Sequence, residues 1–159
     1  MSRRVAASLA ILVAVVALVL SACSSGPRKR VFPPSASVQE LAVQADGGWR
    51  LRLRIQSFSN VPHTVSELSA QLLVDGLPAA TLQVAPAVAI GPQSAEVEDV
   101  VLTPAPDAAA RVSAVLESRR SVRYELRGSL TSTLPDRRRD DFVFEGQLWP
   151  VPGLSGVLR

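Results

Sequence analysis

Cysteine, histidine and aromatic residues are all scarce in this sequence. Its 159 residues include one Cys, one His and 4 % Phe, Trp and Tyr. A single Cys cannot form an intramolecular disulfide, so the stability of the fold must come from a hydrophobic core. A single His offers no set of converging metal ligands and only one imidazole to activate a nucleophile. The scarcity predicts a protein that is not an enzyme and that holds no metal or cofactor.

The residues that could still carry chemistry have simpler explanations. His63 follows Pro62 and is predicted to be a turn residue, not a base or a metal ligand. The segment Gly153 to Gly156, Gly-Leu-Ser-Gly, is one residue short of a nucleophile elbow and has no helix after it. The acidic residues Glu96, Glu98 and Asp99 lack a loop of spaced oxygen ligands, so they are predicted to form the wet face of a strand.

The excess of positive charge is also smaller than the totals suggest. The formal net charge is +3, but removing Arg3 and Arg4 with a leader lowers Lys plus Arg from 17 to 15, against 14 Asp plus Glu. A nearly neutral chain with few aromatics is a poor nucleic-acid binder, so no nucleic-acid partner is predicted. Two basic clusters remain, which are Arg28-Lys29-Arg30 and Arg137-Arg138-Arg139. We predict a solvated linker or turn for both; the alternative for Arg28, Lys29 and Arg30 is contact with anionic lipid headgroups.

The longest apolar run lies at the N-terminus, where two arginines precede it and small residues end it. Residues 1–22 therefore have the layout of a secretory signal peptide. The run ends in Leu20-Ser21-Ala22-Cys23, which resembles the lipobox of bacterial lipoproteins. That resemblance implies cleavage before Cys23, diacylation of its thiol and acylation of the new amine. The alternatives are an uncleaved anchor helix, for which the run is rather short, and a buried thiol.

An acylated Cys23 would attach the protein to a bilayer without spanning it, because about three acyl chains anchor a protein stably. The next residue is Ser24 and not Asp, which in Gram-negative lipoproteins implies the outer membrane, facing the periplasm. A Gram-positive host stays open. Residues 23–37 are rich in Ser, Pro and charge and are predicted to form a flexible tether, which leaves residues 38–159 as one domain.

Alternation of apolar and polar residues predicts that this domain is mainly β. One helix is expected from Asp107, as its N-cap, to Arg119, since Ala108, Val112 and Val115 recur at helical spacing. The Asp46-Gly47-Gly48 and Asp75-Gly76 segments favour tight hairpins. The predicted strands are 38–44, 49–57, 67–74, 77–84, 95–102, 122–130 and 142–148. Strands of this length between turns favour an antiparallel two-sheet sandwich.

The second strand carries the row Arg50, Arg52 and Arg54 on one face. We predict a solvated face on which these arginines meet Asp or Glu across the sheet. The alternative is a surface for an anionic partner, such as a headgroup or another envelope protein.

The order of these elements resembles a known family. An alternating strand that runs into Ser-Asn-Val-Pro at residues 59–62, followed by the hairpin arm Ser-Glu-Leu-Ser-Ala-Gln-Leu-Leu-Val-Asp-Gly, is similar to the late embryogenesis abundant type 2 family, or water stress and hypersensitive response domain. The resemblance covers residues 38 to about 148. It implies an immunoglobulin- or fibronectin-like β-sandwich of about seven strands with one α-helix, and it supplies no catalytic residues.

Two functions follow as expectations. The first is a non-enzymatic envelope lipoprotein whose sandwich binds or shields partners, with protection under water stress as the elaboration that the resemblance implies. The alternative is an accessory lipoprotein that binds or transfers a lipid or other apolar ligand between membranes. An apolar cavity between the sheets would favour the alternative, whereas a filled core would favour the first.

Overall fold

The structure is a computed structural model that describes residue 26 and residues 28–159. The predicted signal peptide, Cys23 and Ser24 lie outside these described residues. In the described part, no helix has the length and apolar character needed to cross a membrane. The elements are β1 (Ser35–Val43), β2 (Trp49–Gln56), β3 (His63–Val74), β4 (Leu77–Val84), β5 (Val88–Ile90), β6 (Ala95–Leu102), α2 (Pro106–Ser118), β7 (Val122–Leu134), β8 (Arg138–Leu148) and β9 (Val157–Leu158).

The strands form two antiparallel sheets, which confirms the predicted β-sandwich. One sheet has the order β6-β2-β1-β9, and the other has the order β4-β3-β7-β8 with β5 paired to β3. The described residues hold nine strands where about seven were expected. The additional β5 and β9 have three and two residues, which is too short for an alternating pattern to show.

The hairpins form where the turn residues predicted them. Val74 pairs with Leu77, and Asp75 and Gly76 between them have φ values of +47° and +82°. Two successive positive φ values are those of a type I′ turn, whose twist matches that of the flanking strands. The β1–β2 hairpin closes with Gly47 at φ +85°.

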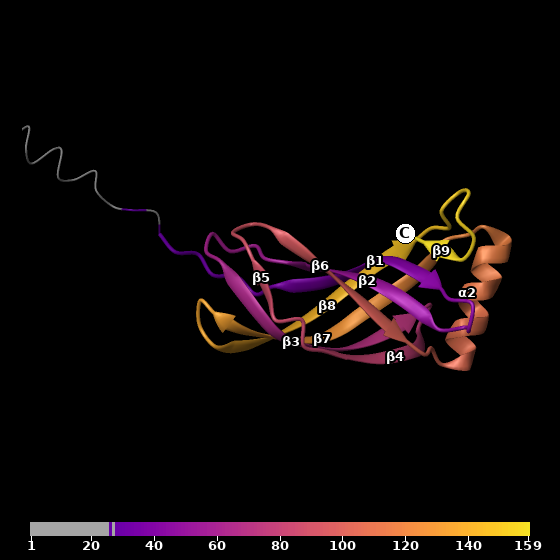
Figure 1. Cartoon of the computed structure of the whole chain (residues 1–159), viewed down its shortest axis with the longest axis horizontal. Coiled ribbons are helices and arrows are strands. Elements are labelled where there is room, and N and C mark those ends of the chain that lie inside the picture. Colours follow the sequence, from indigo (N-terminus) through magenta and orange to yellow (C-terminus); the bar gives the residue numbers. More distant parts are fainter. Residues whose placement is uncertain (1–25, 27) are drawn as a thin grey trace, which may run out of the picture.

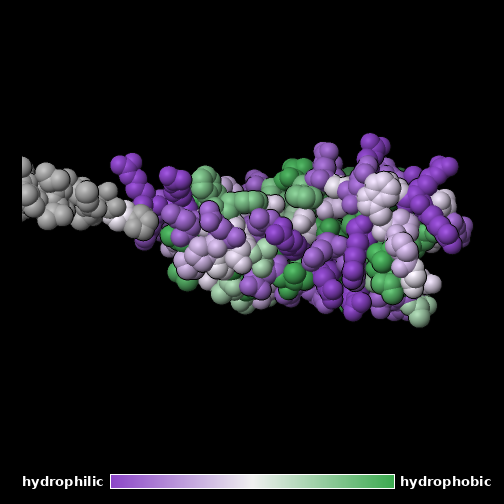
Figure 2. All heavy atoms as spheres, turned by 90° about the horizontal axis from the view of Figure 1, so that it is seen from above, coloured by the Kyte–Doolittle hydropathy of each residue, from purple (hydrophilic) through white to green (hydrophobic). Residues whose placement is uncertain are grey.

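The sandwich is elongated and has two distinct ends (Figures 1 and 2). The chain joins it at one end, named the tail end here, which consists of residues 28–34, 57–63, 90–94 and 134–138. Helix α2 and the C-terminal loop lie at the opposite end, named the helix end. The two ends are separated by the length of β7, which at 13 residues spans about 40 Å.

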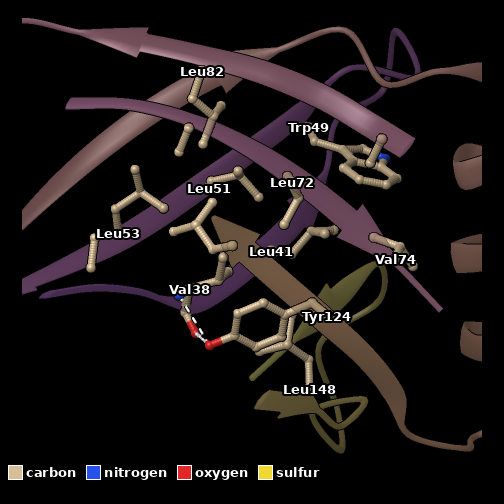
Figure 3. Packing of buried hydrophobic residues seen from close by; sticks show 14 of the residues in the cluster. Val38, Leu41, Trp49, Leu51, Leu53, Leu72, Val74, Leu82, Tyr124 and Leu148 are labelled. Carbon is tan, nitrogen blue, oxygen red and sulfur yellow. Dashed lines mark hydrogen bonds between the residues drawn. The ribbon is translucent and has the colours of Figure 1, made fainter. Parts of the chain in front are cut away.

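Large apolar side chains fill the space between the sheets (Figure 3). The inward residues of β2, which are Trp49, Leu51, Leu53 and Ile55, are no more than 1 % exposed. Leu72 of β3 and other inward side chains of the second sheet meet them in the same cluster. Burial at this scale stabilises the domain by about 25 cal/mol per Å² of apolar surface removed from water.

Tyr124 joins the two sheets through a polar contact inside this core. Its hydroxyl donates to the Val38 carbonyl and accepts from the Val38 amide, both at 3.1 Å (Figure 3). The register of β1 shifts between Val38 and Glu40, and such an irregularity leaves backbone groups for a side chain to satisfy. The ring lies over Gly146, where a Cβ would come within 2.7 Å of it. The sequence pattern places Phe144 on the same face as Phe142 and Leu148; unlike them it is 37 % exposed, and it stacks on Tyr124.

Helix α2 forms close to its predicted position but with different caps. Its N-cap is Ala105, without a side-chain hydrogen bond, and Asp107 lies in the first turn. Pro106 explains the shift, because a proline fits the first helical position and needs no hydrogen-bond acceptor there. The sequence places Arg119 and Arg120 in the last turn, but this is wrong: Arg119 is the C-cap in the left-handed region, and the last turn holds no basic residue. The predicted apolar residues Ala108, Val112 and Val115 are buried.

Candidate functional site

The N-terminal chain is held against the tail end by one side chain, Asn60. Its side-chain amide donates to the Arg28 carbonyl at 2.8 Å, and its side-chain oxygen accepts from the Arg30 amide at 2.7 Å. The Asn60 amide in turn donates to the Arg30 carbonyl at 3.1 Å. We name this arrangement the Asn60 clamp. The described part of the predicted tether is therefore bound to the domain, and β1 begins at Ser35, three residues before the predicted boundary.

A second contact holds the chain two residues further on. The Ser59 hydroxyl accepts from the Phe32 amide at 2.8 Å and lies 3.2 Å from the Phe32 carbonyl. The same hydroxyl is 3.3 Å from Nε2 of His63. Ser59 and His63 are both fully buried. The tail end is thus sealed by hydrogen bonds between the incoming chain and the loop after β2.

His63 is not the turn residue that the sequence predicted. It is the first residue of β3, pairs with Ile90 and points inward. Burial lowers the pKa of His63 below its ordinary value; the nearby Arg138 acts in the same direction, and Asp140 opposes both. A signal was present, because reading the apolar alternation of β3 back from Val65 places His63 on the inner face.

Ser59 and His63 are residue types that nucleophilic catalysis uses, but their surroundings give them a structural role. Neither side chain has exposed surface through which a substrate could approach. The hydroxyl is already engaged by the Phe32 backbone. Nδ1 of His63 and Oδ2 of Asp140 have no hydrogen-bond partner among the described residues, so no hydrogen bond aligns the imidazole with a carboxylate there.

The fold brings the two basic clusters to the same end of the molecule. Arg28, Lys29 and Arg30 are exposed beside the loop after β2. Residues 135–137 form the β7–β8 turn, and Leu134 before it pairs with Thr64, next to His63. The sequence predicts a turn from Arg137 to Asp141 between the last two strands, but the observed turn is earlier and shorter, because Arg138 already begins β8. Arg137 is exposed at its tip, whereas Arg138 forms an ion pair with the largely buried Asp140.

Apolar side chains are also exposed at this end. Phe32 is 47 % exposed, Phe58 is 48 % exposed and Leu134 is 53 % exposed. All three belong to the tail end by the hydrogen bonds and strand pairs described above. Figure 2 shows hydrophilic and hydrophobic surface side by side next to the grey atoms at this end. The sequence did not predict this cluster, because its members are far apart in the chain.

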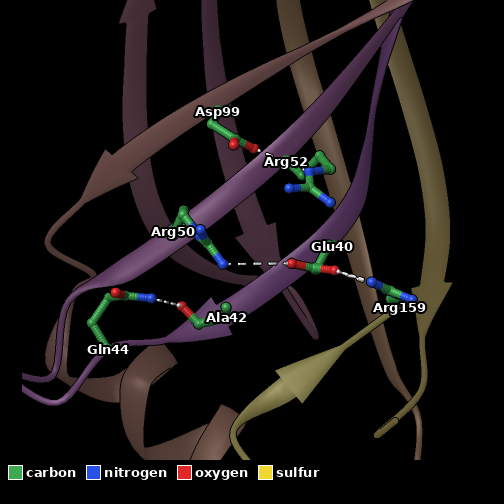
Figure 4. Close-up of polar contacts among 7 residues, drawn as sticks. All are labelled: Glu40, Ala42, Gln44, Arg50, Arg52, Asp99 and Arg159. Carbon is green, nitrogen blue, oxygen red and sulfur yellow. Dashed lines mark hydrogen bonds and ion pairs between the residues drawn. The ribbon is translucent and has the colours of Figure 1, made fainter. Parts of the chain in front are cut away.

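The arginine row of β2 is the outward face that was predicted (Figure 4). Arg52 pairs with Asp99 across the sheet at 3.2 Å, and Arg50 lies 3.9 Å from Glu40. Glu40 is only 6 % exposed because Arg159 also covers it, at 2.7 Å. Arg50 and Arg52 therefore meet carboxylates of neighbouring strands as predicted, whereas Arg54 donates to the side-chain oxygen of Gln56 on its own strand.

Of the remaining candidates, Glu96 lies two residues beyond the tail end on β6, and Ser155 lies at the opposite end. Glu96 and Asp99 are exposed on β6, and among residues 26 and 28–159 no three His, Cys, Asp or Glu side chains are grouped to hold a metal ion. Ser155 lies in the C-terminal loop, which lines a surface hollow with Leu116 of α2. That loop is at the helix end, whereas His63 is at the tail end, so no elbow chemistry is assembled.

Comparison with known proteins leaves the family open. No family model matches the chain, and no curated protein matches its sequence. A protein from Archaeoglobus fulgidus superposes with a TM-score of 0.44 at 15 % identity, covering 77 % of this chain and 98 % of that one. A protein from Arabidopsis thaliana solved in solution gives a TM-score of 0.49 at 14 % identity, covering 79 % and 83 %.

A third solved structure is described as that of a candidate late embryogenesis abundant protein. It gives a TM-score of 0.47 at 14 % identity and covers 84 % of this chain and 76 % of that one. With TM-scores below 0.5, these likenesses decide neither the family nor the function. Membership of the late embryogenesis abundant type 2 family stays a prediction.

Proposed function

We propose that this chain is a non-enzymatic envelope lipoprotein, acylated at Cys23 and held at the periplasmic face of the outer membrane. Its β-sandwich acts there as a stress-protective or partner-binding module. The observation that carries this proposal is the Asn60 clamp, which fixes the chain to the domain from Arg28 onward. An anchor at Cys23 would therefore hold the folded domain directly at the bilayer surface.

The charges beside the clamp support the same location. Arg28, Lys29 and Arg30 are exposed, and each basic residue near an anionic membrane surface contributes about 1 kcal/mol of binding. The acyl chains supply most of the affinity, and the three basic residues add to it.

The filled interior supports a protective or partner-binding module over a lipid carrier. The space between the sheets is occupied by fully buried side chains such as Trp49, Leu53 and Leu126. Three hollows formed by described residues open at the surface: one lies between α2 and the C-terminal loop, and two lie along the strands of the β4-β3-β7-β8 sheet. A lipid carrier would need apolar room inside the sandwich for an acyl chain.

Mass spectrometry of the mature N-terminus tests the anchor. We expect a triacylated Cys23 as the first residue and a folded but released protein when Cys23→Ser is expressed. Ser24→Asp serves as the matched control, which should keep the acyl groups and move the protein out of the outer-membrane fraction of a Gram-negative host. An unmodified Cys23, or a retained 1–22 segment in the membrane fraction, would contradict the assignment.

Survival of drying tests the protective role. A host strain that lacks the protein should lose viability on desiccation and regain it with the wild-type chain but not with Cys23→Ser. Equal survival of all strains would leave the anchored domain without the protective role and would redirect the search to its partner, which cross-linking in the intact envelope would identify.

A further inference from the structure

We propose that the tail end is a membrane-contacting surface, in which Phe32, Phe58 and Leu134 enter the headgroup region of the bilayer that holds the chain. The basic residues Arg28, Lys29, Arg30 and Arg137 face the anionic headgroups around them. This inference rests on the proposed membrane anchor and goes beyond it, since it assigns the domain one orientation and names the residues that set it.

Chain length limits how far the tail end can lie from the anchor. Arg28 follows Cys23 by five residues, and five residues span at most about 18 Å when fully extended. Asn60 binds the backbone of both Arg28 and Arg30, so the loop after β2 lies next to them. The distance from the anchor to this loop is therefore limited as well. Phe58 is two residues before Asn60 in that loop. The surface that carries Phe58 therefore stays close to the bilayer wherever the domain turns.

The composition of the surface fits the membrane interface. Phenylalanine and leucine side chains bury apolar area at the headgroup boundary, while basic side chains around them attract anionic lipids. Phe32 and Phe58 project from segments that hydrogen bonds of Ser59 join, so the two rings lie on neighbouring parts of the same end. Asp136 is the acidic residue within the tail-end segments and is exposed in the turn; just outside them, Asp140 is paired with Arg138 and Glu96 is exposed at the start of β6.

The helix end provides a matched comparison. It also exposes apolar side chains, namely Trp149 at 57 % and Leu154 at 50 %, and it carries the exposed Arg119 and Arg120. Its distance from the tail end is about 40 Å along β7, more than twice the reach of the segment after Cys23. Composition alone would therefore allow either end to face lipid, and the position of the chain's attachment selects the tail end.

Tryptophan fluorescence with brominated lipids tests the orientation. The full chain is purified from membranes and reconstituted in vesicles of phosphatidylethanolamine and phosphatidylglycerol, with or without bromine on the acyl chains. Phe58→Trp reports on the tail end, and Leu154→Trp is the matched variant at the helix end. The wild-type chain gives the background, because Trp49 is buried and Trp149 lies at the helix end.

We expect brominated lipid to reduce the added emission of Phe58→Trp at least about twofold and to leave that of Leu154→Trp unchanged. Adding Arg28→Gln, Lys29→Gln and Arg30→Gln to Phe58→Trp should weaken the quenching. Equal quenching of the two reporters, quenching at Leu154 alone, or no quenching at Phe58 would overturn the proposed surface. The mass of Cys23 is read on the same sample, so a wrong anchor and a wrong orientation give different results.

Discussion

The two ends of this sandwich are closed by different chemistry. At the helix end, Ala108, Val112 and Val115 of α2 cover the core with apolar side chains. At the tail end, Ser59, His63 and the backbone of residues 28–32 close it with hydrogen bonds. An apolar lid contributes in proportion to the area it buries, whereas each hydrogen bond has a small net contribution and requires its partner to stay in place.

The difference predicts different stabilities for the two ends. The helix end shares the hydrophobic cluster of the whole domain, so it should open only when the domain unfolds. The tail end holds a segment that can detach locally and leave the sheets intact. A segment that can detach locally can adjust its conformation to a membrane surface. The helix end, which the core holds in place, stays rigid.

The largest effect is expected at the helix end, from Val112→Asp. Val112 is fully buried, and an unpaired carboxylate in that position has neither water nor a hydrogen-bond partner. We expect the free energy of unfolding to fall by at least about 4 kcal/mol. Urea denaturation followed by circular dichroism measures the change. The control Ser113→Asp adds the same charge on the exposed side of α2, and an equal loss there would refute the apolar lid.

A smaller and local effect is expected at the tail end, from Asn60→Ala. The variant loses two side-chain hydrogen bonds to the chain at Arg28 and Arg30, so the local opening free energy should fall by about 1–2 kcal/mol. Cleavage by trypsin after Arg30 should then become roughly tenfold faster, while the urea midpoint changes little. Thr133→Ala, at an exposed position of β7 next to the tail end, serves as the control. Unchanged cleavage would show that the Asn60 clamp does not hold the chain.

Strong local patterns allowed most of the sandwich to be predicted. The alternation of β2 and β7 and the Asp75-Gly76 turn are visible within a few residues, because side chains on a strand point to opposite faces in turn. Val112 and Val115 gave the inner face of α2 in the same way. The short β5 and β9 could not be predicted, since two or three residues carry no period and their pairing depends on distant strands.

The tail end could not be predicted because its contacts join residues about 30 positions apart. Residues 28–32 are rich in charge, have prolines on both sides and show no apolar period. Their local sequence therefore predicts a flexible tether. What holds them is the amide of Asn60 and the hydroxyl of Ser59, and a hydrogen bond between distant segments leaves no trace in sequence spacing. The grouping of Arg137 with Arg28 likewise follows from topology alone.

The last prediction separates the two ends by their response to acid. His63 is buried at the tail end with its pKa lowered, so it stays neutral in the folded protein at pH values where the unfolded chain, with an ordinary pKa near 6.5, already binds a proton. Stability should therefore be complete above pH 6.5 and decrease as the pH falls below it, by at most about 1.4 kcal/mol per pH unit. His63→Gln removes this group, so its urea midpoint should change less than that of the wild type between pH 6.5 and 5, whatever its stability at neutral pH. The control Val115→Ala weakens the helix end without changing a titrating group, so its urea midpoint should depend on pH as that of the wild type does. Equal pH dependence of the urea midpoint for wild type and His63→Gln would show that the buried imidazole does not set the acid sensitivity of the tail end.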